Sequence, residues 1–74
     1  MKTYKGWIVD KYLGKNSMRG DLAYDIKRDE TFPDELMNCE RITNYLKLRN
    51  ACKECVALFK RTWKDYCKET GYAG

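Results

Sequence analysis

The sequence predicts an all-α protein, a compact bundle of four to five short helices in which the C-terminal helix is the longest. Its longest amphipathic repeat, from Asn50 to Lys68, has the period of a helix. Gly14 and Pro33 divide the preceding residues into segments of helical length, and no segment alternates like a strand. At this length we expect a single domain spanning residues 1–74, with one core rich in aromatic side chains.

A first helix is expected directly after Thr3, whose hydroxyl can accept a hydrogen bond from a first-turn amide. Tyr4, Trp7, Ile8 and Tyr12 recur at helical spacing. Gly14 follows, and we expect it to end this helix.

Ser17 is expected to cap a second helix, which carries its apolar residues on one side. These residues are Met18, Leu22, Ala23 and Ile26. Gly20 in the first turn indicates either a close approach by another helix or a tolerated glycine, and the sequence leaves both open.

A linker from Asp29 to Asn38 follows, because Pro33 restricts Phe32 to an extended conformation. Phe32 is expected to fold back onto the core. A short helical turn is predicted at 34–37.

Asn38 is expected to cap a third helix with apolar residues at Cys39, Ile42, Tyr45 and Leu46. Asn50 is expected to open the last helix, and Gly71 lies just past its last periodic residue. The apolar face of that helix contains Cys52, Cys55, Val56, Phe59, Thr62, Trp63, Tyr66 and Cys67. We predict that Phe59 and Trp63 are core residues.

The residues of these helices resemble the short bacterial proteins of the YozE type, whose fold is similar to the sterile alpha motif (SAM-like). The resemblance covers Thr3 to Tyr66, and its most specific part is a Phe-Pro linker, then Tyr-Leu, then Phe-x-x-x-Trp-x-x-Tyr. The matching residues are Trp7-Ile8, Gly20-Asp21-Leu22-Ala23, Asp25, Asp29, Phe32-Pro33, Ile42, Tyr45-Leu46, Phe59, Trp63 and Tyr66. The resemblance implies a SAM-like bundle from a bacterium or one of its mobile elements. It implies no biochemical activity and assigns no role to the cysteines.

The charge and the apolar runs of the sequence indicate what kind of surface and location to expect. Fifteen basic and eleven acidic residues give a net charge of +4 without a dense basic block, which is typical of a mixed solvated surface. No apolar run approaches the length of a membrane span, and no signal-peptide core follows Met1. We therefore expect a cytoplasmic protein.

The four cysteines leave three interpretations open. Because the chain has no His, a zinc site would need all four, Cys39, Cys52, Cys55 and Cys67. A redox function of the Cys52-x-x-Cys55 pair is the second, and burial as small apolar side chains is the third. The sequence favours burial, so we expect no metal and no cofactor.

Catalysis is not expected either. The chain has no His, no phosphate-binding glycine-rich loop and no serine in a nucleophile motif. Asp21, Asp25 and Asp29 recur every four residues, which is more typical of a solvated face than of a metal site. No small-molecule substrate is expected.

Two binding functions remain. The first is protein–protein interaction, with a partner or by self-association, through Leu58, which we expect to be exposed beside Ala51 and Thr62. The second is nucleic-acid binding through phosphate contacts with a basic stripe of Lys53, Lys60, Arg61, Lys64 and Lys68. The sequence favours protein interaction. A mobile-element protein that inhibits a host protein by shape is a further alternative.

Overall fold

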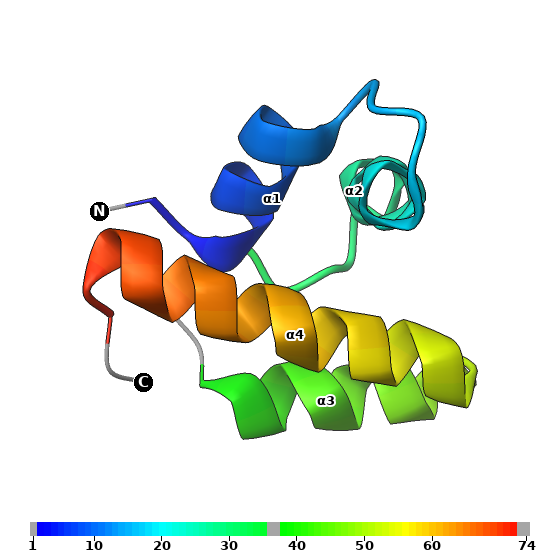
Figure 1. The fold of residues 1–74 in the computed structure, drawn as a ribbon. Coiled ribbons are helices and arrows are strands. Elements are labelled where there is room, and N and C mark those ends of the chain that lie inside the picture. Colours follow the sequence, from blue (N-terminus) through cyan, green and yellow to red (C-terminus); the bar gives the residue numbers. More distant parts are fainter. Residues whose placement is uncertain (1, 36–37, 73–74) are drawn as a thin grey trace. The chain divides into compact units, whose positions relative to one another are not determined.

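The computed structural model describes residues 2–35 and 38–72. These residues form four helices: α1 (Tyr4–Tyr12), α2 (Met18–Arg28), α3 (Cys39–Leu48) and α4 (Lys53–Thr70) (Figure 1). No strand occurs in the described ranges. The predicted all-α class is confirmed, and α4 is the longest helix with 18 residues.

The chain divides into two units of consecutive residues, Met1–Leu36 and Met37–Gly74. In the first unit α1 packs on α2, and in the second α3 packs on α4. The expectation of one bundle over all 74 residues stays a prediction.

In the first unit, the apolar positions expected from the helical period are mostly buried. Tyr4, Ile8, Ala23 and Ile26 are almost fully inaccessible. Phe32 is also buried, and its ring lies 6.4 Å from that of Tyr4, which confirms that the residue before Pro33 folds back onto apolar side chains. Met18 is an exception, because this predicted apolar position of α2 is 65% exposed.

Side-chain caps fix the starts of α1 and α2, as predicted. The Thr3 hydroxyl accepts a hydrogen bond from the amide of Gly6, and the Ser17 hydroxyl accepts one from the amide of Gly20, each at 3.1 Å. Each bond satisfies an amide that has no carbonyl partner within its helix.

Gly20 is explained by a close approach of the chain's own backbone. A Cβ atom built on Gly20 would lie 2.0 Å from the carbonyl oxygen of Lys15. The approaching atoms therefore belong to the loop before α2 and not to another helix. Only glycine fits here without a shift of the loop.

The linker after α2 is not helical where it is described. Asp34 and Glu35 lie outside any helix, so the turn predicted at 34–37 is not formed in its first half. Leu36 and Met37, its second half, lie outside the described residues. The hydroxyl of Thr3 donates a hydrogen bond of 2.6 Å to the Asp34 carboxylate.

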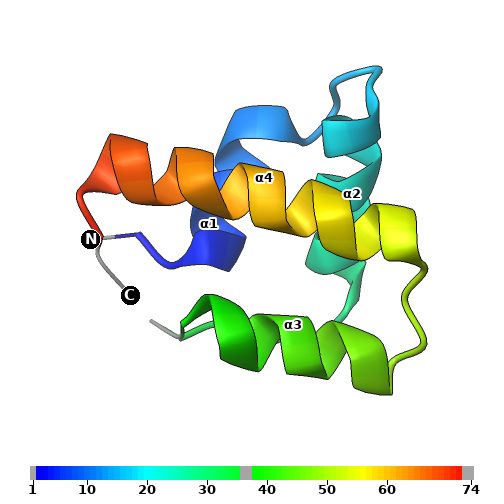
Figure 2. The ribbon, with the colours of Figure 1, turned by 60° about the horizontal axis from the view of Figure 1, so that its bottom comes forward.

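In the second unit, α3 and α4 run in opposite directions (Figure 2). Phe59, Thr62, Trp63 and Tyr66 of α4 are buried, as is Ile42 of α3. The ring of Trp63 lies 5.9 Å from that of Phe59 and 5.2 Å from that of Tyr66. The prediction that Phe59 and Trp63 are core residues is confirmed.

The predicted start of the last helix is wrong by two residues, since its N-cap is Cys52 and not Asn50. Asn50 is not a cap but adopts a left-handed conformation, with φ of 59°, in the turn that ends α3. The amide of Asn50 donates to the carbonyl of Lys47, and the amide of Ala51 to that of Leu46, each at 3.0 Å. This pair of bonds is a Schellman motif, in which asparagine is an accepted substitute for glycine.

Cys52 is the N-cap of α4 instead. Its sulfur accepts a hydrogen bond of 3.4 Å from the amide of Cys55. Cys52 is exposed and Cys55 is half-buried, so the prediction that both are buried apolar residues is wrong. The later helix start explains the error, because it places Cys52 before the first turn and not on the buried face.

The end of α4 follows the sequence closely. Gly71 is left-handed, with φ of 76°, and its amide donates to the carbonyl of Cys67 at 2.8 Å. Beyond it, the ring of Tyr72 lies edge-on to that of Trp63 at 5.9 Å. The residue after the cap thus adds to the aromatic cluster of Phe59, Trp63 and Tyr66.

Candidate functional site

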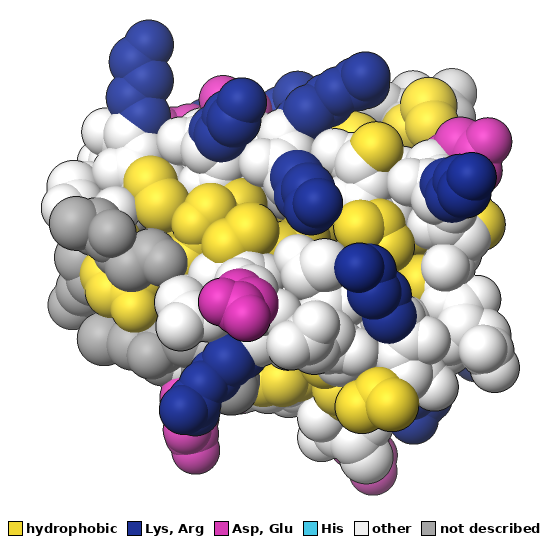
Figure 3. Space-filling model, turned by 90° about the horizontal axis from the view of Figure 1, so that it is seen from below, with side chains coloured by type: hydrophobic (Ala, Val, Ile, Leu, Met, Phe, Trp, Pro, Cys, Tyr) yellow, Lys and Arg dark blue, Asp and Glu magenta, His cyan; other side chains and the backbone are white. Residues whose placement is uncertain are grey.

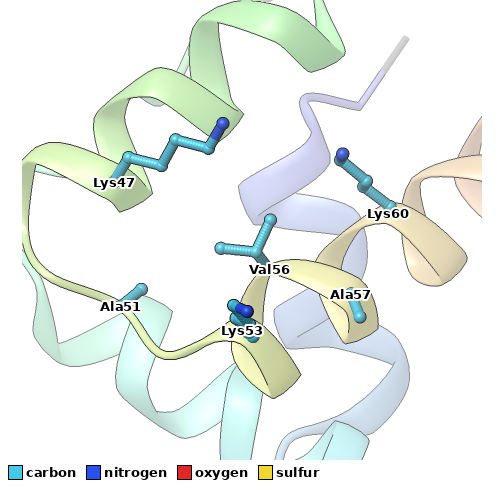
Figure 4. Close-up of a pocket in the computed structure, with 6 residues that line it drawn as sticks. All are labelled: Lys47, Ala51, Lys53, Val56, Ala57 and Lys60. Atoms are coloured by element: carbon cyan, nitrogen blue, oxygen red, sulfur yellow. The ribbon is translucent and has the colours of Figure 1, made fainter.

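An open pocket of about 300 Å³ lies within the second unit, beside the start of α4 (Figure 4). Three small apolar side chains and three lysines line it: Ala51, Val56, Ala57, Lys47, Lys53 and Lys60. In Figure 4 the side chains of Lys47 and Lys60 extend on either side of Val56. The pocket thus combines an apolar floor with a basic rim.

The helical period and the helix pairing explain why these side chains meet. Lys53, Ala57 and Lys60 are four and three residues apart, so they share one face of α4. Lys47 comes from the last turn of α3, which the short turn through Asn50 brings back against α4. One rim lysine therefore comes from a different helix from the other two.

The basic rim has no carboxylate partner within the described residues. Lys47, Lys53 and Lys60 form no ion pair or hydrogen bond in residues 2–35 and 38–72. All three side chains are exposed. A surface with three unneutralised ammonium groups around apolar atoms can bind an anionic group and an apolar group together.

The predicted phosphate contacts are all exposed, but only some belong to the pocket. Lys53 and Lys60 line it, whereas Lys64 and Lys68 continue the same face of α4 toward its C-terminus, and Arg61 lies one residue to the side. Figure 3 shows a face on which lysine and arginine side chains stand among hydrophobic patches.

The predicted protein contacts do not form one exposed surface. Ala51 lines the pocket and is half-buried, and Leu58 is half-buried without being among the described residues that line it. Thr62 is fully buried, as its position on the apolar face of the last helix predicts, so it is wrong as a candidate contact residue. Its hydroxyl donates to the carbonyl of Phe59 at 2.7 Å, so its one polar group is satisfied inside the helix.

Sequence reasoning missed several surface residues. Lys47, Val56 and Ala57 were not expected at a site, and only the pairing of α3 with α4 brings Lys47 to the others. Leu48 is 83% exposed, which makes it the most exposed of the large apolar residues described. The helical period places Leu48 away from the apolar face of Cys39, Ile42 and Leu46, and that signal could have identified it.

The cysteines occupy two different environments, and all four carry thiols. The sulfurs of Cys52 and Cys55 lie 3.1 Å apart at the start of α4. Cys67 is half-buried near the other end, where burial raises the pKa of its thiol and nearby Cys39 adds to the rise. Within the described residues, no three Cys, Asp or Glu side chains gather as a metal site would require.

The carboxylates along α2 do not converge on a site either. Asp21 and Asp25 are exposed, and a carboxylate oxygen of Asp29 accepts hydrogen bonds from the backbone and the hydroxyl of Thr31. Asp29 therefore stabilises the turn after α2.

None of the helices in the described part of the chain has the length and apolar character that a membrane span needs.

The described residues form an all-α protein of four helices, with a small basic and apolar pocket in the second unit. The model of the YozE SAM-like fold family matches residues 3–68. The chain belongs to this family, which confirms the resemblance seen in the sequence. No curated protein and no solved structure matches the chain significantly.

Proposed function

We propose that the protein is a non-catalytic binding module that contacts a partner protein through the pocket beside the start of α4. The observation that carries this proposal is the apolar floor of Ala51, Val56 and Ala57 beneath three lysines without carboxylate partners. A protein segment with an apolar side chain flanked by Asp or Glu fits both parts. Its apolar group would cover the floor while its carboxylates neutralise the rim.

The pocket has a size suited to one or two side chains. Its volume of about 300 Å³ is at the lower end of the range typical of binding pockets. An extended or helical peptide that inserts one leucine is therefore a better occupant than a large cofactor. Contacts around the rim of the pocket would add to the buried area.

Nucleic-acid binding is the second candidate function, and the exposed stripe of Lys60, Lys64 and Lys68 favours it. These lysines repeat every four residues, about 6 Å apart along the helix axis. Asp65 and Glu69 lie on the same helix and reduce the net charge there. Weak, salt-dependent binding is the most that three to five phosphate contacts would provide.

Charge reversal at the pocket is expected to weaken binding of an acidic peptide about tenfold, the equivalent of about 1.4 kcal/mol. The variant is Lys53→Glu with Lys60→Glu, and the probe is a fluorescein-labelled peptide with two leucines flanked by glutamates. Fluorescence anisotropy measures its affinity. The matched control is Lys64→Glu with Lys68→Glu, which changes the same charge on the same helix outside the pocket.

The wild type and the two double variants also distinguish the two functions. If the peptide binds in the pocket, the control retains its affinity, and a version of the peptide with lysine in place of glutamate does not bind the wild type. Random duplex DNA should respond to both double variants alike, with log K falling with log salt by about 0.9 per phosphate contacted. Equal loss of peptide affinity in both variants would contradict the pocket proposal.

A further inference from the structure

The pair Cys52 and Cys55 has the arrangement of a dithiol that can close to a disulfide. The two sulfurs lie 3.1 Å apart, and a covalent sulfur–sulfur bond is about 2.05 Å long. Closure therefore needs a movement of about 1 Å at the side chains. The N-cap geometry holds the pair in this position, since the amide of Cys55 donates to the sulfur of Cys52.

The two thiols differ in access, which gives each a distinct role. Cys52 is exposed at the end of the helix, where an external sulfur can reach it. Cys55 is half-buried in the first turn of α4, with its sulfur 3.1 Å from that of Cys52. An incoming disulfide therefore reacts with Cys52 first. Cys55 is then the thiol nearest to the mixed disulfide on Cys52.

We propose that Cys52 and Cys55 form a thiol–disulfide exchange site that reacts with low-molecular-weight disulfides. The Cys52 thiolate attacks one sulfur of the disulfide, forming a mixed disulfide and releasing one thiolate. The Cys55 thiolate then attacks the Cys52 sulfur, forming the internal bond and releasing the second thiolate. The protein loses two electrons and two thiol protons, and the small disulfide is reduced to two thiols.

The other two cysteines provide an internal contrast. Burial raises the pKa of Cys67, which lowers the thiolate fraction at neutral pH, and the thiolate is the reactive form. The sulfur of Cys39 lies 3.9 Å from the hydroxyl of Thr43. Cys67 is therefore expected to react more slowly with a disulfide than Cys52 does.

The test uses the full chain in buffers of reduced and oxidised glutathione. After acid quenching, remaining thiols are alkylated with N-ethylmaleimide and located by mass spectrometry of peptides. We expect an internal Cys52–Cys55 bond, with Cys39 and Cys67 alkylated. The variant Cys39→Ser with Cys67→Ser should form the same bond. Recovery of both Cys52 and Cys55 as alkylated thiols, or of Cys52 only as a glutathione adduct, would overturn the proposal.

Single variants test the order of the two steps. Cys55→Ser should accumulate the glutathione adduct at Cys52, whereas Cys52→Ser should leave Cys55 about tenfold less modified because of its lower exposure. Serine is a good N-cap, so Cys52→Ser is expected to fold, and circular dichroism checks this. Faster modification of Cys55 than of Cys52 would contradict the assigned roles.

A comparison with the unfolded chain shows whether the helix positions the pair. In the folded protein, the equilibrium constant for closing the Cys52–Cys55 bond with glutathione should be about tenfold greater than in concentrated urea, because α4 holds the sulfurs together. An equal or smaller constant in the folded protein would overturn the role of α4.

Discussion

Replacement of Trp63 by alanine is expected to lower the free energy of unfolding by about 3–5 kcal/mol. Trp63 is only 7% exposed, and its ring contacts those of Phe59, Tyr66 and Tyr72. The variant loses the burial of a large side chain and leaves a cavity among three aromatic rings. Urea unfolding followed by far-ultraviolet circular dichroism measures the change.

Two further variants make this result interpretable. Lys64→Ala, the exposed neighbour on α4, should change the free energy of unfolding by less than about 0.5 kcal/mol. Trp63→Phe keeps an aromatic ring and should cost less than the alanine variant, so it remains measurable if Trp63→Ala does not fold. A cost below about 1 kcal/mol for Trp63→Ala would show that the aromatic cluster is not a core.

The second large effect is expected at Gly20. Alanine usually stabilises a helix relative to glycine by up to about 1 kcal/mol, but here its Cβ would overlap the backbone of Lys15, with the carbonyl carbon at 2.8 Å and the oxygen at 2.0 Å. A backbone neighbour cannot move aside as a flexible side chain can. We therefore expect Gly20→Ala to lower the free energy of unfolding by about 1–3 kcal/mol.

Gly6 is a matched control for this variant. It occupies the third position of α1, as Gly20 does in α2, and both donate to a side-chain cap. A Cβ on Gly6 would lie 3.4 Å from the Thr3 hydroxyl oxygen, an ordinary contact. Gly6→Ala should therefore stabilise the protein by about 0.5–1 kcal/mol in the same urea experiment. Stabilisation by both variants would contradict the close approach at Lys15.

Most helix boundaries were predictable because the signals that set them are local. Each N-cap side chain accepts a hydrogen bond from the backbone amide three residues further along the chain, so a short stretch of sequence identifies it. These N-caps are Thr3, Ser17 and Asn38. The end of α4 was predictable in the same way. The residue just past its apolar repeat adopts a left-handed conformation, which glycine adopts most readily, and Gly71 stands there. The all-α class follows from these local signals together with the helical period of the apolar residues.

The start of α4 was not predictable in this way. Asparagine is favoured both as an N-cap and as the left-handed residue that ends a helix, so Asn50 fits either role. The choice depends on where α3 ends, and the bonds from Asn50 and Ala51 back to Lys47 and Leu46 decide it. Cysteine is a weak acceptor, so Cys52 gave no capping signal.

The candidate site was only half predictable. The exposure of Lys53 and Lys60 follows from the helical period, whereas their proximity to Lys47 depends on how α3 pairs with α4. Thr62 was wrongly included among the contact residues although the helical period places it on the apolar face, where its hydroxyl bonds to the carbonyl of Phe59. A periodic pattern does not report such bonds.

The division into two helix pairs has a consequence for how fast the chain can fold. Each pair is built from consecutive residues, and a short connection joins its two helices. The loops that must close before the helices meet are therefore small, and the entropy lost in closing them is low. Helix formation and pairing become local events, as in other helical proteins of low contact order that fold rapidly.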